Sequence, residues 1–222
     1  MLKISLALRD TDGWHRAGEL ARTTYAETHA ADVKPDPDAF VLAVPSERDP
    51  VPGGTVLACA GCTYAAPDRP FFSERYLDTR IEEAIAARTG TPVDRDRIIE
   101  IGALAGPGGA GRELIRVIPI IAWTMGMEHI LCTVTKQLRD LLARLDINYT
   151  VLGEADPDHL TPQERAAWGT YYDQRPTVGF IDLARLAGLF AGATGRYAFF
   201  APVVELLTDA TTPREVVGRA GR

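Results

Sequence analysis

The chain has 222 residues, a formal net charge of −6, a pI near 5.3 and 46% hydrophobic residues. This size and composition fit one globular domain with a small appendage, and they exclude a disordered chain. The acidic balance argues against a nucleic-acid partner, which would require a clustered basic face.

No segment of the sequence indicates export or a membrane span. Residues 1–10 become charged too early for a signal peptide, and no apolar run approaches the length of a bilayer-spanning helix. Three cysteines without a secretion signal indicate a reducing compartment and no disulfide framework. We therefore expect a cytoplasmic protein with no membrane contact.

The first half of the chain alternates between strand and helix patterns. Residues 2–8 alternate as a half-buried strand, and residues 17–28 carry a helical apolar stripe. Two apolar strands, 39–44 and 55–64, flank a loop rich in proline and glycine, which predicts a hairpin. A short helix over 81–88 follows.

The second half continues the alternation with four strands and three helices. The strands are expected over 98–105, 129–135, 149–152 and 177–183, and the helices over 114–125, 138–145 and 161–172.

This order predicts an α/β (α+β) fold with a mixed central sheet of about seven strands and flanking helices. Residues 184–222 are expected to be mainly helical. We assign a domain to 1–183 and a helical C-terminal extension, packed on it, to 184–222.

The segment from Arg97 to Leu114 joins an apolar strand, a glycine-rich turn and a helix start. Backbone N–H groups at such a turn, together with the helix dipole, form a cradle for an anion. The spacing does not match a P-loop, since Arg112 and Glu113 stand where Lys and Ser/Thr are needed, and it fails the dinucleotide fingerprint. A tight strand-to-helix turn would show the same composition.

The same segment resembles the fourth strand and following turn of the GNAT acetyltransferases, where an arginine- and glycine-rich turn grips the pyrophosphate of coenzyme A. Residues 131–147 resemble the fifth strand and helix of that family, although Leu145-Asp146-Ile147 departs from its corner. The resemblance implies that the cofactor is bound by Leu104, Ala105, Gly108, Gly109, Ala110, Gly111 and Arg112.

A second resemblance spans residues 71–183. The segments 71–78, 99–105 and 168–172 resemble the landmarks of the thermostable-hemolysin family. That family's fold is taken to be similar to those of acetyltransferases and acyl-homoserine-lactone synthases, and the lactone synthases also place a glutamate where Glu100 stands. The resemblance implies an acyltransferase that moves an acyl group from a coenzyme A or acyl-carrier-protein thioester to an amine, in small-molecule biosynthesis.

Making an amide from a thioester requires a base for the amine, donors for the oxyanion and an acid for the thiolate. Glu100, partly desolvated between isoleucines, is the candidate base, and a structural ion pair with Arg75 or Arg97 is the alternative. Tyr171 and Tyr172 are candidate proton donors, and aromatic packing is their alternative. Oxyanion donors are expected among the N–H groups of residues 103–105.

Two further groups of side chains are candidates for substrate binding. The polar-aromatic residues Glu74, Tyr76 and Asp78 could cover an acceptor pocket or form an ordinary capped loop, and Thr133 and Thr135 could bind acyl or pantetheine amides or serve only as good strand residues. Neither the cysteines nor the histidines have metal-ligand spacing, so we predict no metal site.

Two other classes of function remain open from the sequence. The chain could be a non-catalytic or membrane-active, hemolysin-like protein, or a degenerate acyltransferase fold that only binds ligand. The apolar residues 186–207 lack the basic polar face of interfacial helices, which favours core packing or a dimer contact. S-adenosylmethionine as a co-substrate is compatible with the lactone-synthase resemblance, although no residue indicates it, and the sequence leaves monomer and homodimer open.

Overall fold

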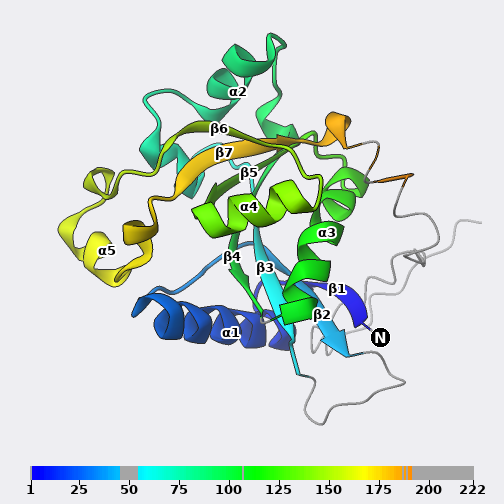
Figure 1. The fold of residues 1–222 in the computed structure, drawn as a ribbon, viewed down its shortest axis with the longest axis vertical. Helices are drawn as coiled ribbons and strands as arrows, with labels where there is room; N and C mark the ends of the chain where they lie inside the picture. Colours follow the sequence, from blue (N-terminus) through cyan, green and yellow to red (C-terminus); the bar gives the residue numbers. More distant parts are fainter. Residues whose placement is uncertain (1, 46–54, 107, 187, 189, 192–222) are drawn as a thin grey trace, which may run out of the picture.

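The computed structural model describes residues 2–45, 55–106, 108–186, 188 and 190–191. Within them the chain forms a seven-stranded sheet in the order β1-β2-β3-β4-β5-β7-β6, with helices on both sides (Figure 1). The strands are β1 (Leu2–Leu8), β2 (Ala39–Pro45), β3 (Ala58–Tyr64), β4 (Ile98–Ala105), β5 (His129–Val134), β6 (Tyr149–Glu154) and β7 (Thr177–Asp182). The predicted hairpin loop over 46–54 and most of the predicted C-terminal helical region lie outside the described residues.

The sheet is mixed, which confirms the predicted fold class. Strands β1 to β4 form an antiparallel half, and β5, β7 and β6 form another antiparallel half. The two halves meet where β4 runs parallel to β5. This parallel junction, in the middle of an otherwise antiparallel sheet, becomes the position of the candidate site.

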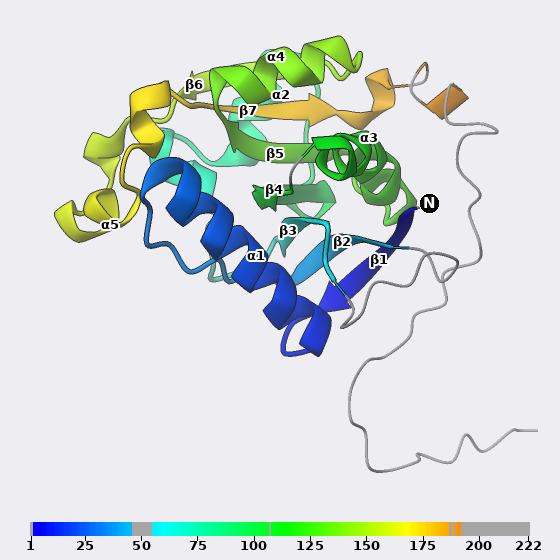
Figure 2. The same cartoon turned by 60° about the horizontal axis from the view of Figure 1, so that its bottom comes forward.

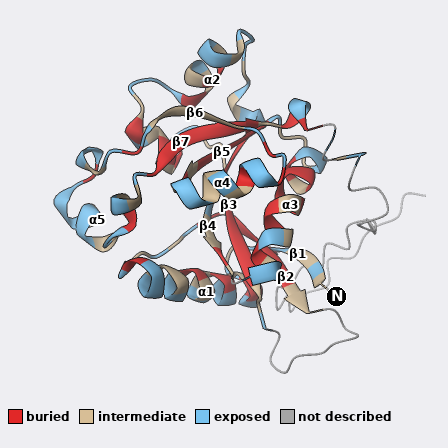
Figure 3. Cartoon of the chain, viewed as in Figure 1, coloured by how far each residue is buried: buried red, intermediate tan, exposed pale blue. Residues whose placement is uncertain are grey.

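The described residues contain five α-helices, which lie on and beside the two faces of the sheet (Figure 2). They are α1 (Asp12–His29), α2 (Ile81–Thr89), α3 (Gly108–Thr124), α4 (Lys136–Arg144) and α5 (Pro162–Ala167). One face packs against α3 and α4, through a core cluster that includes Leu114, Ile118 and Leu142. The opposite face packs against α1 and α2 and against a short 3-10 helix, Phe72–Tyr76 (η1). Figure 3 shows the buried residues gathered along the strands and the inner sides of the helices.

The structure corrects two predicted boundaries. The helix expected over 161–172 ends at Ala167, because the chain turns at Gly169 to dock on the end of α1. Gly169 has a φ of 52°, and a Cβ there would lie 2.1 Å from the His29 carbonyl oxygen. The glycines expected to form a turn at 108–111 instead form the first turn of α3, and the change of direction occurs at Gly106, with a φ of 143°.

Among the helices formed by the described residues, none is both long and apolar enough to cross a bilayer.

Candidate functional site

Strands β4 and β5 separate part-way along their length. They pair only over Ile98–Glu100 against His129–Leu131, and past Glu100 strand β4 pairs with β3 alone. A β-bulge increases the divergence, because Ala103, at a φ of 48°, and the residue after it together oppose a single residue of β3. The side of β4 that faces β5 therefore has no strand partner beyond Glu100.

A cavity of about 240 Å³ occupies this gap between the strands. It runs from α1 on one face of the sheet to α3 and α4 on the other, and most of its wall is apolar. Representative apolar residues of the wall are Ile101, Leu104, Ile115, Ile118, Leu138 and Leu142. A cavity of this kind suits an apolar chain with a few polar anchoring points.

The polar residues of the wall lie mainly on α1 and β5. They are Thr24, Tyr25, Thr28, His29, Thr133, Thr135 and Tyr171. Burial lowers the pKa of His29, so its imidazole is neutral at pH 7. Gly102 forms the open part of the wall, since it is exposed and a Cβ added there would meet no atom within 4 Å.

Glu100 lies next to this cavity but does not line it. The residue is 7% exposed, and its carboxylate accepts three hydrogen bonds from η1. The donors are the Phe72 backbone N–H at 2.8 Å, the Ser73 backbone N–H at 2.9 Å and the Ser73 hydroxyl at 2.6 Å. Burial raises the pKa of Glu100, and these donors offset only part of the effect.

Ser73 connects Glu100 to the cavity wall. Its Oγ lies 2.8 Å from the Oγ1 of Thr133, which lines the cavity. Sequence reasoning missed Ser73, although it lies inside the segment chosen for its charged and aromatic residues. The available signal was its position directly before Glu74, the residue that fixes η1.

Glu74 holds η1 in place. Its carboxylate accepts hydrogen bonds from the backbone N–H groups of Phe71, at 2.7 Å, and Ile81, at 3.0 Å. The Arg95 guanidinium donates to both of its oxygens at 2.7 Å. This arrangement points Glu74 away from the cavity, and Asp78 lies with it along a separate surface groove.

The two arginines considered as ion-pair partners of Glu100 bind elsewhere. Arg75 pairs with Glu164 at 2.5 Å, and Arg97 donates to the Gly126 carbonyl at 2.8 Å. Within the described residues, the Glu100 carboxylate is bound by the hydrogen-bond donors of η1.

The aromatic candidates separate into two positions. Tyr171 lines the cavity, with its hydroxyl 3.4 Å from the Thr133 carbonyl oxygen, and burial raises its pKa well above the usual range. Tyr172 lies outside the wall and hydrogen-bonds the Tyr76 hydroxyl at 2.5 Å. Thr135 lines the cavity while its Oγ1 caps α4 by accepting the Leu138 N–H.

The residues expected to bind a cofactor surround the start of α3. Gly108 and Gly109 are exposed, with open space where a side chain would stand, and Arg112 is exposed. Gly111 is buried, and a side chain would not fit there, because a Cβ would lie 2.6 Å from the Gly106 carbonyl oxygen. Of the remaining candidates, Leu104 is on the cavity wall, Ala110 is half-buried and Ala105 is buried.

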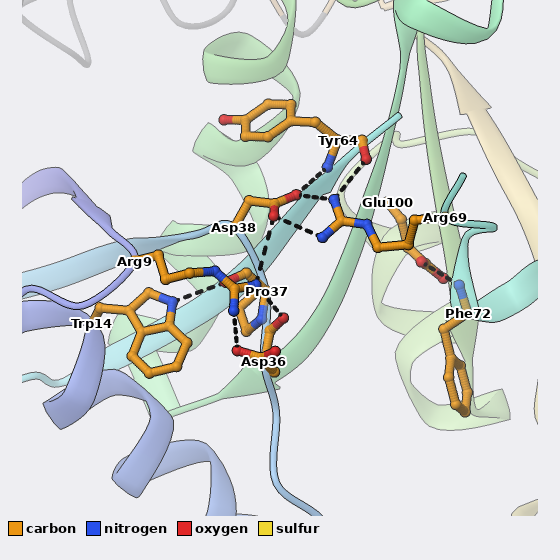
Figure 4. A network of polar contacts seen from close by, with 9 residues as sticks. All are labelled: Arg9, Trp14, Asp36, Pro37, Asp38, Tyr64, Arg69, Phe72 and Glu100. Atoms are coloured by element: carbon orange, nitrogen blue, oxygen red, sulfur yellow. Dashed lines mark hydrogen bonds and ion pairs between the residues drawn. The ribbon is translucent and has the colours of Figure 1, made fainter. Parts of the chain in front are cut away.

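A polar network that the sequence did not reveal lies beside Glu100 (Figure 4). Arg69 donates to both carboxylate oxygens of Asp38, which also accepts the Tyr64 N–H at 2.9 Å. Burial raises the pKa of Asp38, but Arg69 and the Tyr64 N–H outweigh it and lower the net pKa. Figure 4 shows Arg69 lying between Asp38 and Glu100, so the network fixes the loop before β2 against the segment that leads to η1.

The cysteines and other metal-ligand side chains form no evident metal centre. Cys59, Cys62 and Cys132 are buried free thiols, and burial raises the pKa of each to about 12. Across the described part of the chain, no three His, Cys, Asp or Glu side chains form a group suited to a metal ion.

Comparisons with known proteins place this geometry in context. The family described as thermostable hemolysin matches residues 7–186. A search of curated protein sequences finds no match.

Three solved structures illustrate the fold. The acyl-homoserine lactone (AHL) synthase LasI is 12% identical with a TM-score of 0.52, and the match covers 82% of this chain and 90% of LasI. FeeM, an N-acyl amino acid synthase from uncultured soil microbes, is 11% identical with a TM-score of 0.54, and the match covers 83% of this chain and 91% of FeeM. BjaI, a CoA-dependent acyl-homoserine lactone synthase in a structure with SAM and isopentyl-CoA, is 12% identical with a TM-score of 0.55. The match covers 88% of this chain and 89% of BjaI. The fold is thus that of acyl-transferring synthases.

Proposed function

The chain belongs to the thermostable hemolysin family and has the fold of acyl-transferring synthases, and from this premise we propose that it is an acyltransferase. The donor would be an acyl thioester of coenzyme A or of an acyl carrier protein, and the acceptor a small-molecule amine. The observation that carries the proposal is the gap between β4 and β5, with its apolar cavity, beside the start of α3.

The acyl chain would occupy the apolar part of the cavity, between β4 and the helices α3 and α4. Pro119 lies in this wall and has no N–H to donate, so the Ile115 carbonyl one turn earlier lacks its usual helical partner. The pyrophosphate or phosphopantetheine phosphate would bind near Gly108 and Gly109, where the helix start is open. The first N–H groups of a helix have no partner within it and can bind an anion.

The thioester carbonyl would lie along the free side of β4. Past Glu100 the N–H groups on this side have no partner in β5, and the bulge at Ala103 changes their direction. Such N–H groups can stabilise the oxyanion that forms when the amine attacks the carbonyl carbon. The C–S bond then breaks, and the hydroxyl of Tyr171, which lines the cavity, would donate a hydrogen bond to the leaving thiolate.

Thiol release tests the proposal directly. Acyl-CoA and acyl-carrier-protein thioesters of several chain lengths would be incubated with a panel of amines, and free thiol measured with a chromogenic disulfide. The protein's own thiols are buried and have pKa values of about 12, so their background should be small. We expect amine-dependent thiol release, and its absence with every thioester would contradict the proposed function.

A matched pair of variants links the activity to the cavity. Gly102→Val adds a side chain to the open part of the wall, at a position where no atom lies within 4 Å of the new Cβ. Gly188→Val makes the same change at another exposed open position outside the cavity. We expect loss of turnover for Gly102→Val alone, with both melting temperatures unchanged. If Gly102→Val and Gly188→Val were equally active, the reaction would not take place in this cavity.

A further inference from the structure

The proposed reaction needs a route by which the amine loses its proton, and Glu100 does not reach the cavity itself. Its carboxylate oxygens are occupied by donors from η1, and the residue is not part of the cavity wall. The amine therefore cannot contact Glu100 while the structure keeps this arrangement.

The hydroxyl groups of Ser73 and Thr133 connect the Glu100 carboxylate to the cavity. The Ser73 Oγ lies 2.6 Å from Glu100 Oε1 and 2.8 Å from Thr133 Oγ1. A serine hydroxyl has one proton to donate. While Glu100 is ionised it can only accept, so Ser73 donates to Glu100, and Thr133 must donate to Ser73.

With the hydrogen bonds donated in this direction, the lone pairs of Thr133 Oγ1 remain free to accept a proton at the cavity wall. We propose that the acceptor amine loses its proton to Thr133, and that Ser73 passes a proton on to Glu100 as the final acceptor. In this scheme, which rests on the proposed acyltransferase function, Thr133 is the catalytic residue and Ser73 and Glu100 are relay residues behind it.

The step balances in protons and electrons. The amine nitrogen forms a bond to the thioester carbon, and its excess proton moves to Thr133 Oγ1. The Thr133 proton moves to Ser73 Oγ and the Ser73 proton to Glu100 Oε1, so each hydroxyl gives and receives one. The C–S bond breaks, the thiolate leaves with the bonding pair, and the proton returns along the chain to the thiolate. Glu100 is then ionised for the next cycle.

Four variants and one control test the relay in the thiol-release assay. Thr133→Val and Ser73→Ala each remove one hydroxyl, the double variant removes both, and Thr133→Ser keeps the hydroxyl. Thr63→Val is the control, because Thr63 is the β3 residue paired with Glu100 and is neither in the relay nor on the cavity wall.

We expect kcat to fall by about 10²–10⁴-fold for Thr133→Val and for Ser73→Ala, with KM nearly unchanged, since a general base contributes about that much. Thr133→Ser should recover most of the activity. The double variant should be no slower than the slower single variant, because either substitution already interrupts the same chain.

Three results would overturn the relay. They are a Thr133→Val kcat equal to that of Thr63→Val, a rise in KM in place of a fall in kcat, or single effects that multiply in the double variant. An inactive wild type would instead contradict the acyltransferase function, and the relay with it, so the two failures are distinguishable. If Thr133→Val does not fold, Ser73→Ala and Thr133→Ser decide by the same criteria.

Discussion

Arg95 provides a demanding test of how the candidate site is supported. Its guanidinium donates to both oxygens of Glu74 at 2.7 Å and to Glu82 at 2.8 Å. The three side chains are only 16%, 10% and 17% exposed, and the guanidinium stacks 4.8 Å from the Phe71 ring centroid. Arg95→Met keeps an apolar stem against the ring but leaves the mostly buried Glu74 carboxylate without a counter-charge, while Glu82 keeps its ion pair with Arg80 at 2.6 Å.

The expected loss of stability is large for a single substitution. Removing one partner of a buried ion pair costs about 3–5 kcal/mol, and the partial exposure of this cluster places the loss near the lower end. In a chain of this size each kcal/mol corresponds to roughly 2–4 °C. We therefore expect the melting temperature of Arg95→Met to fall by about 6–12 °C.

The loss should also depend on pH. Burial raises the pKa of Glu74, but hydrogen bonds from Arg95 and the Ile81 and Phe71 N–H groups outweigh it, so the net pKa is lowered. A carboxyl group with a lowered folded pKa adds stability above its unfolded pKa, about 4.3, and loses it as pH falls through the folded value. The difference between wild type and Arg95→Met should thus be full at pH 7 and shrink below about pH 4.

Urea unfolding at both pH values measures this difference. Lys136→Met is the control, since it removes a cation from an exposed pair with Asp140, whose side chains are 71% and 48% exposed, and it should leave stability nearly unchanged. A loss below about 1 kcal/mol for Arg95→Met at pH 7, or the same loss at low pH, would refute the reasoning.

Further predictions concern the start of α3 and the pH profile. Gly111→Val should unfold at a markedly lower temperature, because its Cβ would lie 2.6 Å from the Gly106 carbonyl oxygen. Gly109→Val should keep its melting temperature and raise the KM for the thioester. A fall in melting temperature for both variants would mean that the turn has only a structural role. Because burial raises the pKa of Glu100 and the base must be ionised, kcat/KM should rise with pH and level off above the ordinary glutamate range. Ser73→Ala interrupts the relay between Thr133 and Glu100, so its residual activity should lose this acid limb, and an unchanged limb would assign it to another group.

The elements of the fold could be predicted because their signals are local. Alternating and helical apolar patterns mark β1, α1 and β4, and the bounds expected for β4, residues 98–105, are those observed. The helix expected to reach residue 172 was wrong because Gly169 is required by a contact with His29, a residue 140 positions earlier (169 − 29 = 140). Pattern reasoning does not register such a long-range contact.

The candidate site could be predicted only in part, for the same reason. Glu100 stood out as a carboxylate in an apolar strand, but the cavity depends on where β4 leaves β5 and on a bulge at Ala103, an alanine that carries no sequence signal for a positive φ. In the segment after residue 70, charge drew attention to Glu74, which turned out to face Arg95. The neutral Ser73 beside it makes the contact with Glu100 and Thr133.

A crystal structure with a non-hydrolysable thioether analogue of an acyl-CoA would test the central proposal most directly. We predict that the acyl chain lies between β4 and β5, with the CH2 group that replaces the thioester carbonyl beside residues 102–105 and the phosphates at the start of α3. An analogue bound outside this gap, with the gap closed by its own side chains, would contradict the account.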